Sequence, residues 1–494
     1  MDLLVNEATI LNIFGELFAV IMWISAILIL IMIFLERSDP KTIAMWTVIL
    51  LFIPVIGFFI YLCFGQTFYQ RRQFAIKNIS DHELAYLKAE ALEELNKGSV
   101  TPDDERGLHF ARAMLEAGGS TYSNNNDLRL YTIGDPFFKD ILNDLRGAKK
   151  FIHLEYYIIR NDKVTNEFMD ILIDKAKNGV EVKLMVDAVG FNNGPKKRIK
   201  ELRKAGGEFK LFHRAITVLL SPRKQNRNHR KLAVIDGTIG YVSGFNIGDE
   251  YLGKGSMGFW RDTGVRVEGN GAIPINTRFF MDWGYATKNQ LDATDAEKID
   301  RYFPIDKSTN YGNGIMQLIS GGPDTKNNPI ELQYLKLINT ARKTLYIHTP
   351  YLVPSSEVQK ALIISACSGV DVRIIMPDQP DHMFVFWVGI LNAGELLENG
   401  VRIYQYKKGF VHSKTLVADS EFCSVGSANL DQRSMRLNFE TNAMIYSNEI
   451  GNQMTAAFLE DLEYCEEYSI DDFRKLTIWD NFKISIARLF SPLA

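Results

Sequence analysis

Cysteine is scarce in this chain, and neither sign of charge predominates. The four cysteines among 494 residues are scattered and form no Cys-x-x-Cys pair, which excludes a disulfide framework and argues against a zinc site. With 56 basic and 59 acidic side chains, the chain lacks the strongly basic balance expected of a nucleic-acid-binding protein. Its length is sufficient for two or three compact units, each with its own core.

Two long uncharged apolar runs occupy the amino-terminal part, at residues 17–35 and 43–65. Each has roughly the 20 residues that a helix needs to cross about 30 Å of hydrocarbon. A signal peptide followed by a core helix is the alternative, but the first run lacks a basic leader and a small-residue cleavage site. We therefore expect residues 1–66 to form a transmembrane hairpin.

Basic residues near the two runs bear on the side of the membrane that the remaining chain occupies. The Arg71-Arg72 pair follows the second run, whereas no basic residue precedes the first. Such a pair suits the anionic cytoplasmic leaflet, and free cysteines suit a reducing compartment. The connector also carries Arg37 and Lys41, so charge counting alone does not decide. We expect a multi-pass protein of the cell membrane with a cytoplasmic body.

Beyond the hairpin, residues 67–127 are polar and mostly helical in pattern, and we expect them to form a connecting arm. The rest of the chain repeats itself with a period of roughly 190 residues, which indicates a duplicated domain. The matched segments are 152–156 with 347–351, 179–184 with 369–374, and 207–211 with 400–404.

Helix and strand patterns alternate in both halves, and helices give way through glycine to alternating apolar strands. We predict an α/β fold of two duplicated α-β-α domains, at residues 128–300 and 301–494, related by a pseudo-two-fold axis. The carboxyl end, residues 473–494, has apolar residues at nearly helical spacing. Packing against the body and docking at a lipid interface are both open for this amphipathic segment.

One motif, His-x-Lys-x-x-x-x-Asp, occurs at the same place in each repeat. An Asn follows each motif Asp by ten residues, preceded by small residues that include Ser427. A single match would be weak, but two at equivalent positions are strong. The motif residues, which we expect to make up the catalytic set, are His229, Lys231 and Asp236 in the first half and His412, Lys414 and Asp419 in the second, with Asn246 and Asn429 downstream.

The motif spacing suits chemistry on a phosphodiester. His and Lys two residues apart on a strand project to the same face and can address one bound group. A neutral imidazole can attack phosphorus, a nearby ammonium can neutralise the non-bridging oxygens, and a second His can move the proton of an alcohol. A lone His on an apolar strand is more often a core residue, but the duplication reverses that preference. The two motifs are therefore expected to build one active site.

The other polar motif members allow a structural interpretation as well. Asp236-Gly237 and Asp419-Ser420 are turn dipeptides, so the carboxylates are expected to support the site by fixing a hairpin. Asn246, Ser427 and Asn429 could donate hydrogen bonds to phosphate oxygens, or serve as ordinary turn residues. Both interpretations stay open.

The paired motifs resemble those of the phospholipase D superfamily, and further segments are similar to bacterial cardiolipin synthases. The resemblance covers nearly the whole chain. It implies transfer of a phosphatidyl group between two phosphatidylglycerol molecules, giving cardiolipin and glycerol, without a cofactor or a metal ion. The segments that carry it are the apolar hairpin, Tyr156-Tyr157-Ile158, Trp260-Arg261-Asp262, Pro380-Asp381-His382, 409–414 and 429–434.

The resemblance also implies roles for particular residues. In the superfamily, an acidic residue downstream of each motif orients the catalytic His. Glu440 takes that place in the second half, where it would hold His412, and Asp262 is the candidate in the first. By the same resemblance His229 is the nucleophile and His412 the general acid and base, with both motif lysines on the phosphate oxygens.

Three further histidines are weaker candidates. His153 and His348 recur in the repeat but lie in apolar strands, so structural roles are expected. His382 lies in a loop similar to that of the family, where it could line the passage for lipid.

Other functions remain open at this level. A superfamily nuclease or phosphodiesterase, and a membrane phospholipase D that produces phosphatidic acid, would use the same histidines; a scaffold with an inactive fold would not need both motifs intact. The apolar runs and the balanced charge argue against the nuclease. The expected partners are phosphatidylglycerol, cardiolipin and the bilayer, and the sequence is compatible with a homo-oligomer. The sequence does not indicate the acyl-chain preference or the regulation of the protein.

Overall fold

The structure is a computed structural model of the whole chain. It describes residues 2–35, 40–53, 56–57, 105–212, 226–289, 291–292, 295–304, 308–325 and 327–489. The chain divides into two compact units, described separately below. One contains residues 1–78 with 215–225, and the other, called the body, contains 79–214 and 226–492.

The amino-terminal unit contains helices α1 (Asp2–Leu35) and α2 (Pro40–Phe52). No helix in the described part of the chain is both long enough and apolar enough to cross a membrane. The predicted hairpin therefore stays a prediction. Most of the carboxyl half of its second run, the Arg71-Arg72 pair and residues 67–104 of the predicted arm lie outside the described residues.

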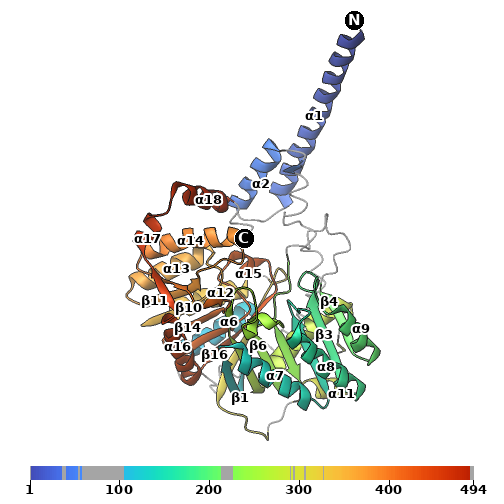
Figure 1. Cartoon of the computed structure of the whole chain (residues 1–494), viewed down its shortest axis with the longest axis vertical. Coiled ribbons are helices and arrows are strands. Elements are labelled where there is room, and N and C mark those ends of the chain that lie inside the picture. Colours follow the sequence, from blue (N-terminus) through green and yellow to red (C-terminus); the bar gives the residue numbers. More distant parts are fainter. Residues whose placement is uncertain are drawn as a thin grey trace. The chain divides into compact units, whose positions relative to one another are not determined.

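A single mixed sheet runs through the body and has fifteen strands within the described residues (Figure 1). Its order is β17-β12-β11-β10-β14-β15-β16-β9-β1-β8-β6-β5-β2-β3-β4. The first-half strands are β1 (Tyr122–Tyr131), β2 (Phe151–Tyr156), β3 (Glu181–Asp187), β4 (Glu208–Phe212), β5 (Leu232–Ile235), β6 (Ile239–Ser243) and β8 (Gly264–Gly269). The second-half strands are β9 (Gly314–Gly321), β10 (Thr344–His348), β11 (Asp371–Pro377), β12 (Arg402–Tyr406), β14 (Thr415–Ala418), β15 (Phe422–Gly426), β16 (Glu440–Tyr446) and β17 (Cys465–Tyr468).

The two halves of this sheet repeat one pattern outward from its centre. Strands β1 and β9 pair antiparallel at the middle. From there the order β1-β8-β6-β5-β2-β3-β4 in one direction matches β9-β16-β15-β14-β10-β11-β12 in the other. Opposite directions from an antiparallel central pair are what a pseudo-two-fold axis produces. The predicted duplication of an α/β unit is thus confirmed.

The strand registers correct one detail of the predicted repeat. His153 of β2 lies opposite Lys183, whereas the equivalent Arg373 lies opposite Tyr346 of β10. His153 therefore corresponds to Tyr346, so the expected match of 152–156 with 347–351 is wrong by two residues. Because side chains alternate with a period of two, a shift of two residues leaves the apolar pattern unchanged and escapes detection in the sequence.

Helices cover the sheet and enclose one apolar core in each half. In α8, the Asp162 carboxylate accepts the Thr165 N–H and starts the helix, while Phe168 and Leu172, four residues apart, face the core. The first-half helices are α7 (Gly134–Gly147), α8 (Lys163–Lys177), α9 (Lys196–Lys204), η3 (Asp249–Leu252), α10 (Ala272–Thr287) and α11 (Ala296–Tyr302). The others are α6 (Glu105–Gly118), α12 (Pro329–Thr340), α13 (Ser356–Cys367), α14 (Met383–Glu398), α15 (Gln432–Arg436), α16 (Asn448–Leu462), α17 (Ile470–Arg474) and α18 (Ile478–Leu489).

Helix α6 corrects the extent of the predicted connecting arm. Its Phe110 and Leu115 are fully buried in the core of the second half. The following strand, β1, lies at the centre of the sheet. Residues 105–127 are therefore part of the body, because their apolar face is needed to complete its core.

Candidate active site

Short parallel pairings between the two halves place the motif histidines. Strand β13 (Gly409–Val411) pairs with β7 (Phe259–Arg261), and Asn228 pairs in the same sense with Phe439. The His412 N–H donates to the Arg261 carbonyl at 2.8 Å, and the His229 N–H donates to the Phe439 carbonyl at 2.9 Å. The stretch before each His thus lies beside the stretch before the acidic residue of the other half.

Each histidine consequently takes its carboxylate from the opposite half. His229 Nδ1 lies 3.0 Å from Glu440, and His412 Nδ1 lies 2.6 Å from Asp262. The expected pairing of Glu440 with His412 is wrong. The family resemblance suggested a partner within the same half, but the backbone pairings between halves decide which carboxylate meets which ring.

In both rings Nδ1 faces the carboxylate, and Nε2 is the nitrogen left available. The Ser427 carbonyl also approaches His229 Nδ1, at 3.1 Å. Among the described residues, neither Nε2 atom has a hydrogen-bond partner. A carboxylate on Nδ1 places the proton of a neutral ring there and leaves the lone pair of Nε2 for a substrate.

The motif lysines are buried beside these rings. Lys231 Nζ donates to the His229 carbonyl at 2.6 Å, and Lys414 Nζ donates to the His412 carbonyl. Burial lowers the pKa of Lys231 to about 7 and that of Lys414 to about 8, and the nearby Lys414 ammonium further disfavours the charge of Lys231. Two cationic groups so enclosed favour an anion between them.

The electrostatic environment keeps the rings neutral and the carboxylates charged. Burial is the largest effect that lowers the pKa of His229, and burial followed by the nearby Lys414 lowers that of His412 to about 4. Burial alone would raise the pKa of Glu440, but His229 and Lys231 outweigh it and leave that pKa below its ordinary value. Lys414 and His412 do the same for Asp262. Neutral imidazole beside carboxylate is the state required of a nucleophile or a base.

The two halves differ in the small residues that precede the downstream Asn. The first half has Ser243-Gly244 and the second has Gly426-Ser427, and the surroundings of the two acids explain this difference. The Ser427 hydroxyl donates to the Glu440 carboxylate. At the equivalent place, a Cβ added to Gly244 would lie 2.0 Å from the Asp262 carboxylate, so a larger residue would displace it. The two acids are thus held differently.

Aromatic side chains that sequence reasoning did not select complete the site. The Tyr157 ring packs edge-on against His229, and Trp260 packs against His412 with ring centres 5.4 Å apart. The Tyr251 hydroxyl lies 3.3 Å from His412 Nδ1. Tyr157 and Trp260 lie in two of the segments that resemble the family, and this resemblance is the sequence signal that could have identified them.

The predicted amide residues have mostly structural contacts. The Asn246 side chain accepts the Ile158 N–H and donates to the Tyr251 hydroxyl at 2.9 Å, so both ends of its amide are engaged. Asn429 donates to Asp431, while its buried Oδ1 has no hydrogen-bond partner within the described residues. A phosphate contact by Asn429 stays a prediction.

Asp236 and Asp419 lie away from the histidines, at the opposite ends of β5 and β14. Asp236 accepts the backbone N–H groups of residues 149–151, and Asp419 accepts those of 342–344. Both have positive φ, 53° and 54°. With a rise of about 3.3 Å per residue, each lies roughly 16 Å along the strand from the motif Lys. Their inclusion among catalytic residues is corrected, whereas the expected turn-fixing role fits these contacts.

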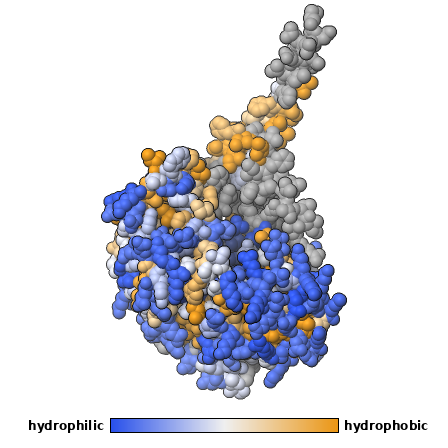
Figure 2. Space-filling model, in the orientation of Figure 1, coloured by the Kyte–Doolittle hydropathy of each residue, from blue (hydrophilic) through white to orange (hydrophobic). Residues whose placement is uncertain are grey.

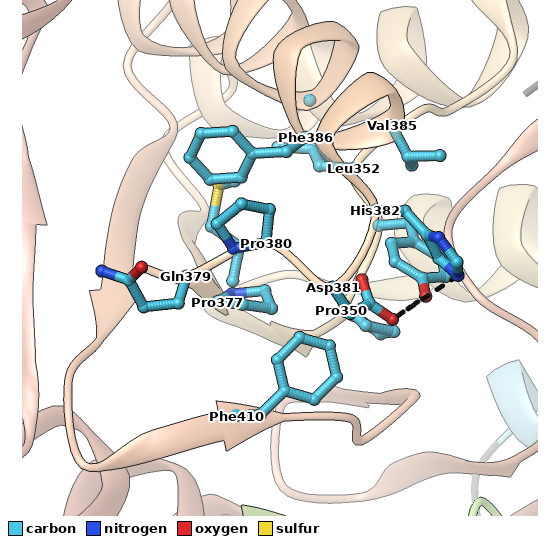
Figure 3. Close-up of a pocket in the computed structure, with 13 residues that line it drawn as sticks. Pro350, Leu352, Pro377, Gln379, Pro380, Asp381, His382, Val385, Phe386 and Phe410 are labelled. Carbon is cyan, nitrogen blue, oxygen red and sulfur yellow. Dashed lines mark hydrogen bonds and ion pairs between the residues drawn. The ribbon is translucent and has the colours of Figure 1, made fainter. Parts of the chain in front are cut away.

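Of the three weaker histidine candidates, two have structural contacts and one lines a pocket. Buried His153 contacts Asn276 and Glu181, and buried His348 contacts Thr415 and Asp461, as structural roles would require. His382, by contrast, lines a pocket at the amino end of α14 (Figure 3).

That pocket adjoins the site. Its lining includes Phe410, two residues before His412, and Asp381, which accepts a hydrogen bond from the Tyr351 hydroxyl. The Phe410 and Trp260 rings are 4.9 Å apart. Phe410 also lies beside the catalytic candidate His412, with ring centres 6.1 Å apart.

Within the described residues, no group of three or more His, Cys, Asp or Glu side chains is arranged to hold a metal ion. The expectation of metal-free chemistry stays a prediction.

The family model described as "Cardiolipin synthase, PLD-like domain" matches residues 141–256 and 334–462, and "Phospholipase D-nuclease N-terminal" matches residues 21–66. A cardiolipin synthase of Clostridium perfringens (strain SM101 / Type A) is 41% identical over 464 residues, which cover 93% of this chain and 95% of the relative. A cardiolipin synthase of Staphylococcus aureus (strain Mu50 / ATCC 700699) is 40% identical over 472 residues, 93% of each chain.

Among solved structures, phosphatidylserine synthase from Haemophilus influenzae Rd KW20 has a similar fold. The TM-score is 0.56 with 15% sequence identity, over 74% of this chain and 95% of that one. This likeness concerns the fold alone.

Proposed function

Because the chain belongs to the cardiolipin synthase family of the phospholipase D superfamily, we propose that it transfers a phosphatidyl group from one phosphatidylglycerol to another, giving cardiolipin and glycerol. The observation that supports this most is the pair of histidine–carboxylate contacts, each formed between halves, with two buried lysines beside them. This arrangement can bind one phosphodiester and present two imidazoles to it.

In the first step, Nε2 of His229 attacks phosphorus while the bond to the glycerol oxygen breaks. The bound phosphodiester anion raises the pKa of His412, so its ring carries a proton on Nε2 as well. His412 gives that proton to the glycerol oxygen, so free glycerol leaves and a phosphatidyl-histidine remains. In the second step, His412 takes the proton of the terminal hydroxyl of a second phosphatidylglycerol, whose oxygen attacks phosphorus and releases His229. Lys231 and Lys414 neutralise the non-bridging oxygens in both steps.

The direct test is incubation of purified full-length protein with phosphatidylglycerol and a metal chelator. We expect equal amounts of cardiolipin and glycerol, measured by lipid mass spectrometry and an enzymatic glycerol assay. Phosphatidic acid as the main product would instead make the protein a hydrolase. Complete loss of activity on chelation, restored by a divalent ion, would contradict the metal-free mechanism.

The pH dependence follows from the two buried lysines. Because burial lowers their pKa values to about 7 and about 8, they are charged below these values and lose charge as the pH rises through them. We expect kcat/KM for phosphatidylglycerol to fall between about pH 7 and pH 8. A bound phosphate anion raises both pKa values, so kcat should fall only at higher pH. A kcat that fell at lower pH than kcat/KM would contradict this role.

The membrane hairpin at residues 17–35 and 43–65 and the cytoplasmic body are further parts of the proposal. In their support, α1 exposes large apolar side chains such as Phe18 and Trp23. The match over residues 21–66 covers the same region. A protease added to sealed right-side-out membranes should leave the body intact, as judged by immunoblotting; digestion of the body there would place it outside the cell.

A further inference from the structure

Helix α18 has two apolar faces, and only one of them packs against the body. Ile484 and Ala487 are buried, with Ala487 beside Val388 of α14. On the other side, Ile478, Trp479, Phe482 and Ile486 are exposed, Ile478 by 87% and Trp479 by 72%. At 3.6 residues per turn, these four side chains fall within an arc of about 100°, opposite the buried pair. Packing on the body therefore leaves these four apolar side chains of the helix uncovered.

The exposed face continues toward the pocket beside the active site. Phe473, before α18, lies against Gly394 in the carboxyl part of α14, whereas Lys483 lies over the Trp387 ring nearer its amino end. The chain thus runs antiparallel to α14 and leads toward its first turn. There Met383 is exposed by 58%, and Phe384 is partly exposed. These two residues and the four of α18, on helices that pack against each other, are called the apolar rim below. Figure 2 shows hydrophobic residues on the surface where α18 lies in Figure 1.

Beyond Met383, the first turn of α14 lines the pocket through Val385 and Phe386, and the opposite wall is Phe410 (Figure 3). The rim therefore borders this pocket, and the Phe410 ring in the pocket wall lies 6.1 Å from the His412 ring. A substrate held at the histidines by its phosphate could direct its hydrocarbon chains past this pocket toward the rim.

We propose that the apolar rim inserts into the surface of an anionic lipid bilayer and aligns the pocket with it, so that phosphatidyl substrates reach the histidines without leaving the membrane. This rests on the proposed function. Exposed Trp and Phe at one face of a helix suit the boundary between headgroups and acyl chains. Lys483 and Lys475 beside that face can meet anionic headgroups, since their contacts with Asp480 and Asp472 are solvent-exposed pairs of little strength.

The test places an environment-sensitive fluorophore on a cysteine introduced by Phe482→Cys or, as a matched control on a polar side of the same helix, Asn481→Cys. Both are made in the full-length chain with Cys63, Cys367 and Cys465 changed to serine. In vesicles containing phosphatidylglycerol with brominated acyl chains, we expect strong quenching at position 482 and little at 481. Equal quenching, or none at 482, would overturn the proposal and favour a second copy of this chain as the covering surface.

A functional measurement separates this inference from the proposed function. Trp479→Ser with Phe482→Ser should lower activity on vesicles roughly 10-fold, with less than about a 2-fold change on phosphatidylglycerol dispersed in detergent. Equal loss in both systems would overturn the role of the rim. An unaltered protein that is inactive in both systems would contradict the proposed function, while the quenching would still report on the rim.

Discussion

Replacing His229 with alanine should reduce cardiolipin formation by roughly 10⁴-fold or more, because the proposed covalent bond to phosphorus forms on this residue. Replacing His412 should be as damaging with phosphatidylglycerol, since the departing glycerol needs its proton. A phosphatidyl ester of p-nitrophenol should distinguish the two variants, because its leaving group departs without a general acid. On that substrate the His412→Ala protein should release one equivalent of p-nitrophenol and stop.

The measurement is the burst of p-nitrophenol together with peptide mass spectrometry of the trapped phosphatidyl group. We expect the group on His229 in the His412→Ala protein and no labelled protein after His229→Ala. Label on His412, with the His229→Ala protein still labelled, would reverse the assignment.

Glu440→Gln and Asp262→Asn should each lower turnover by roughly 10³-fold, because a buried amide can no longer hold and charge-stabilise the ring that it contacts. The contacts between halves decide which step each change affects. Glu440 lies on His229, so Glu440→Gln should slow formation of the intermediate from the p-nitrophenyl ester. Asp262 lies on His412, so Asp262→Asn should form the intermediate and accumulate it.

Single-turnover kinetics on the same ester provide the comparison. Glu467→Gln is a suitable control, because this carboxylate lies on the edge strand β17, pairs with Arg402 at the surface, and its loss should leave the protein like the unaltered one. If Asp262→Asn slowed formation and Glu440→Gln accumulated the intermediate, each acid would be acting on the histidine of its own half, contrary to the geometry.

The residues of the site could be predicted where their signal is local. His229 and Lys231 are two residues apart, as are His412 and Lys414, and strand alternation alone places each pair on one face. Duplication of the motif then made a shared site more probable than two core histidines. The long apolar runs at 17–35 and 43–65 are equally local, and they led to the expectation of a hairpin.

Some sequence patterns were compatible with more than one arrangement. A period of two residues could not distinguish His153 opposite Lys183 from a register shifted by two, and only the paired strands resolved it. The position of Asp236 in the motif suggested chemistry, although an extended strand carries it roughly 16 Å from Lys231.

By itself, therefore, the sequence determined the two motifs, the duplicated α/β unit and the family resemblance, because each depends on neighbouring residues or on a repeated order along the chain. Only the tertiary structure decided that Glu440 serves His229 and Asp262 serves His412. Those contacts depend on pairing of β7 with β13, and of Asn228 with Phe439, between segments 150 or more residues apart. Such short pairings leave no periodic signal, and they form because the pseudo-two-fold axis brings the two motif ends of the sheet halves together.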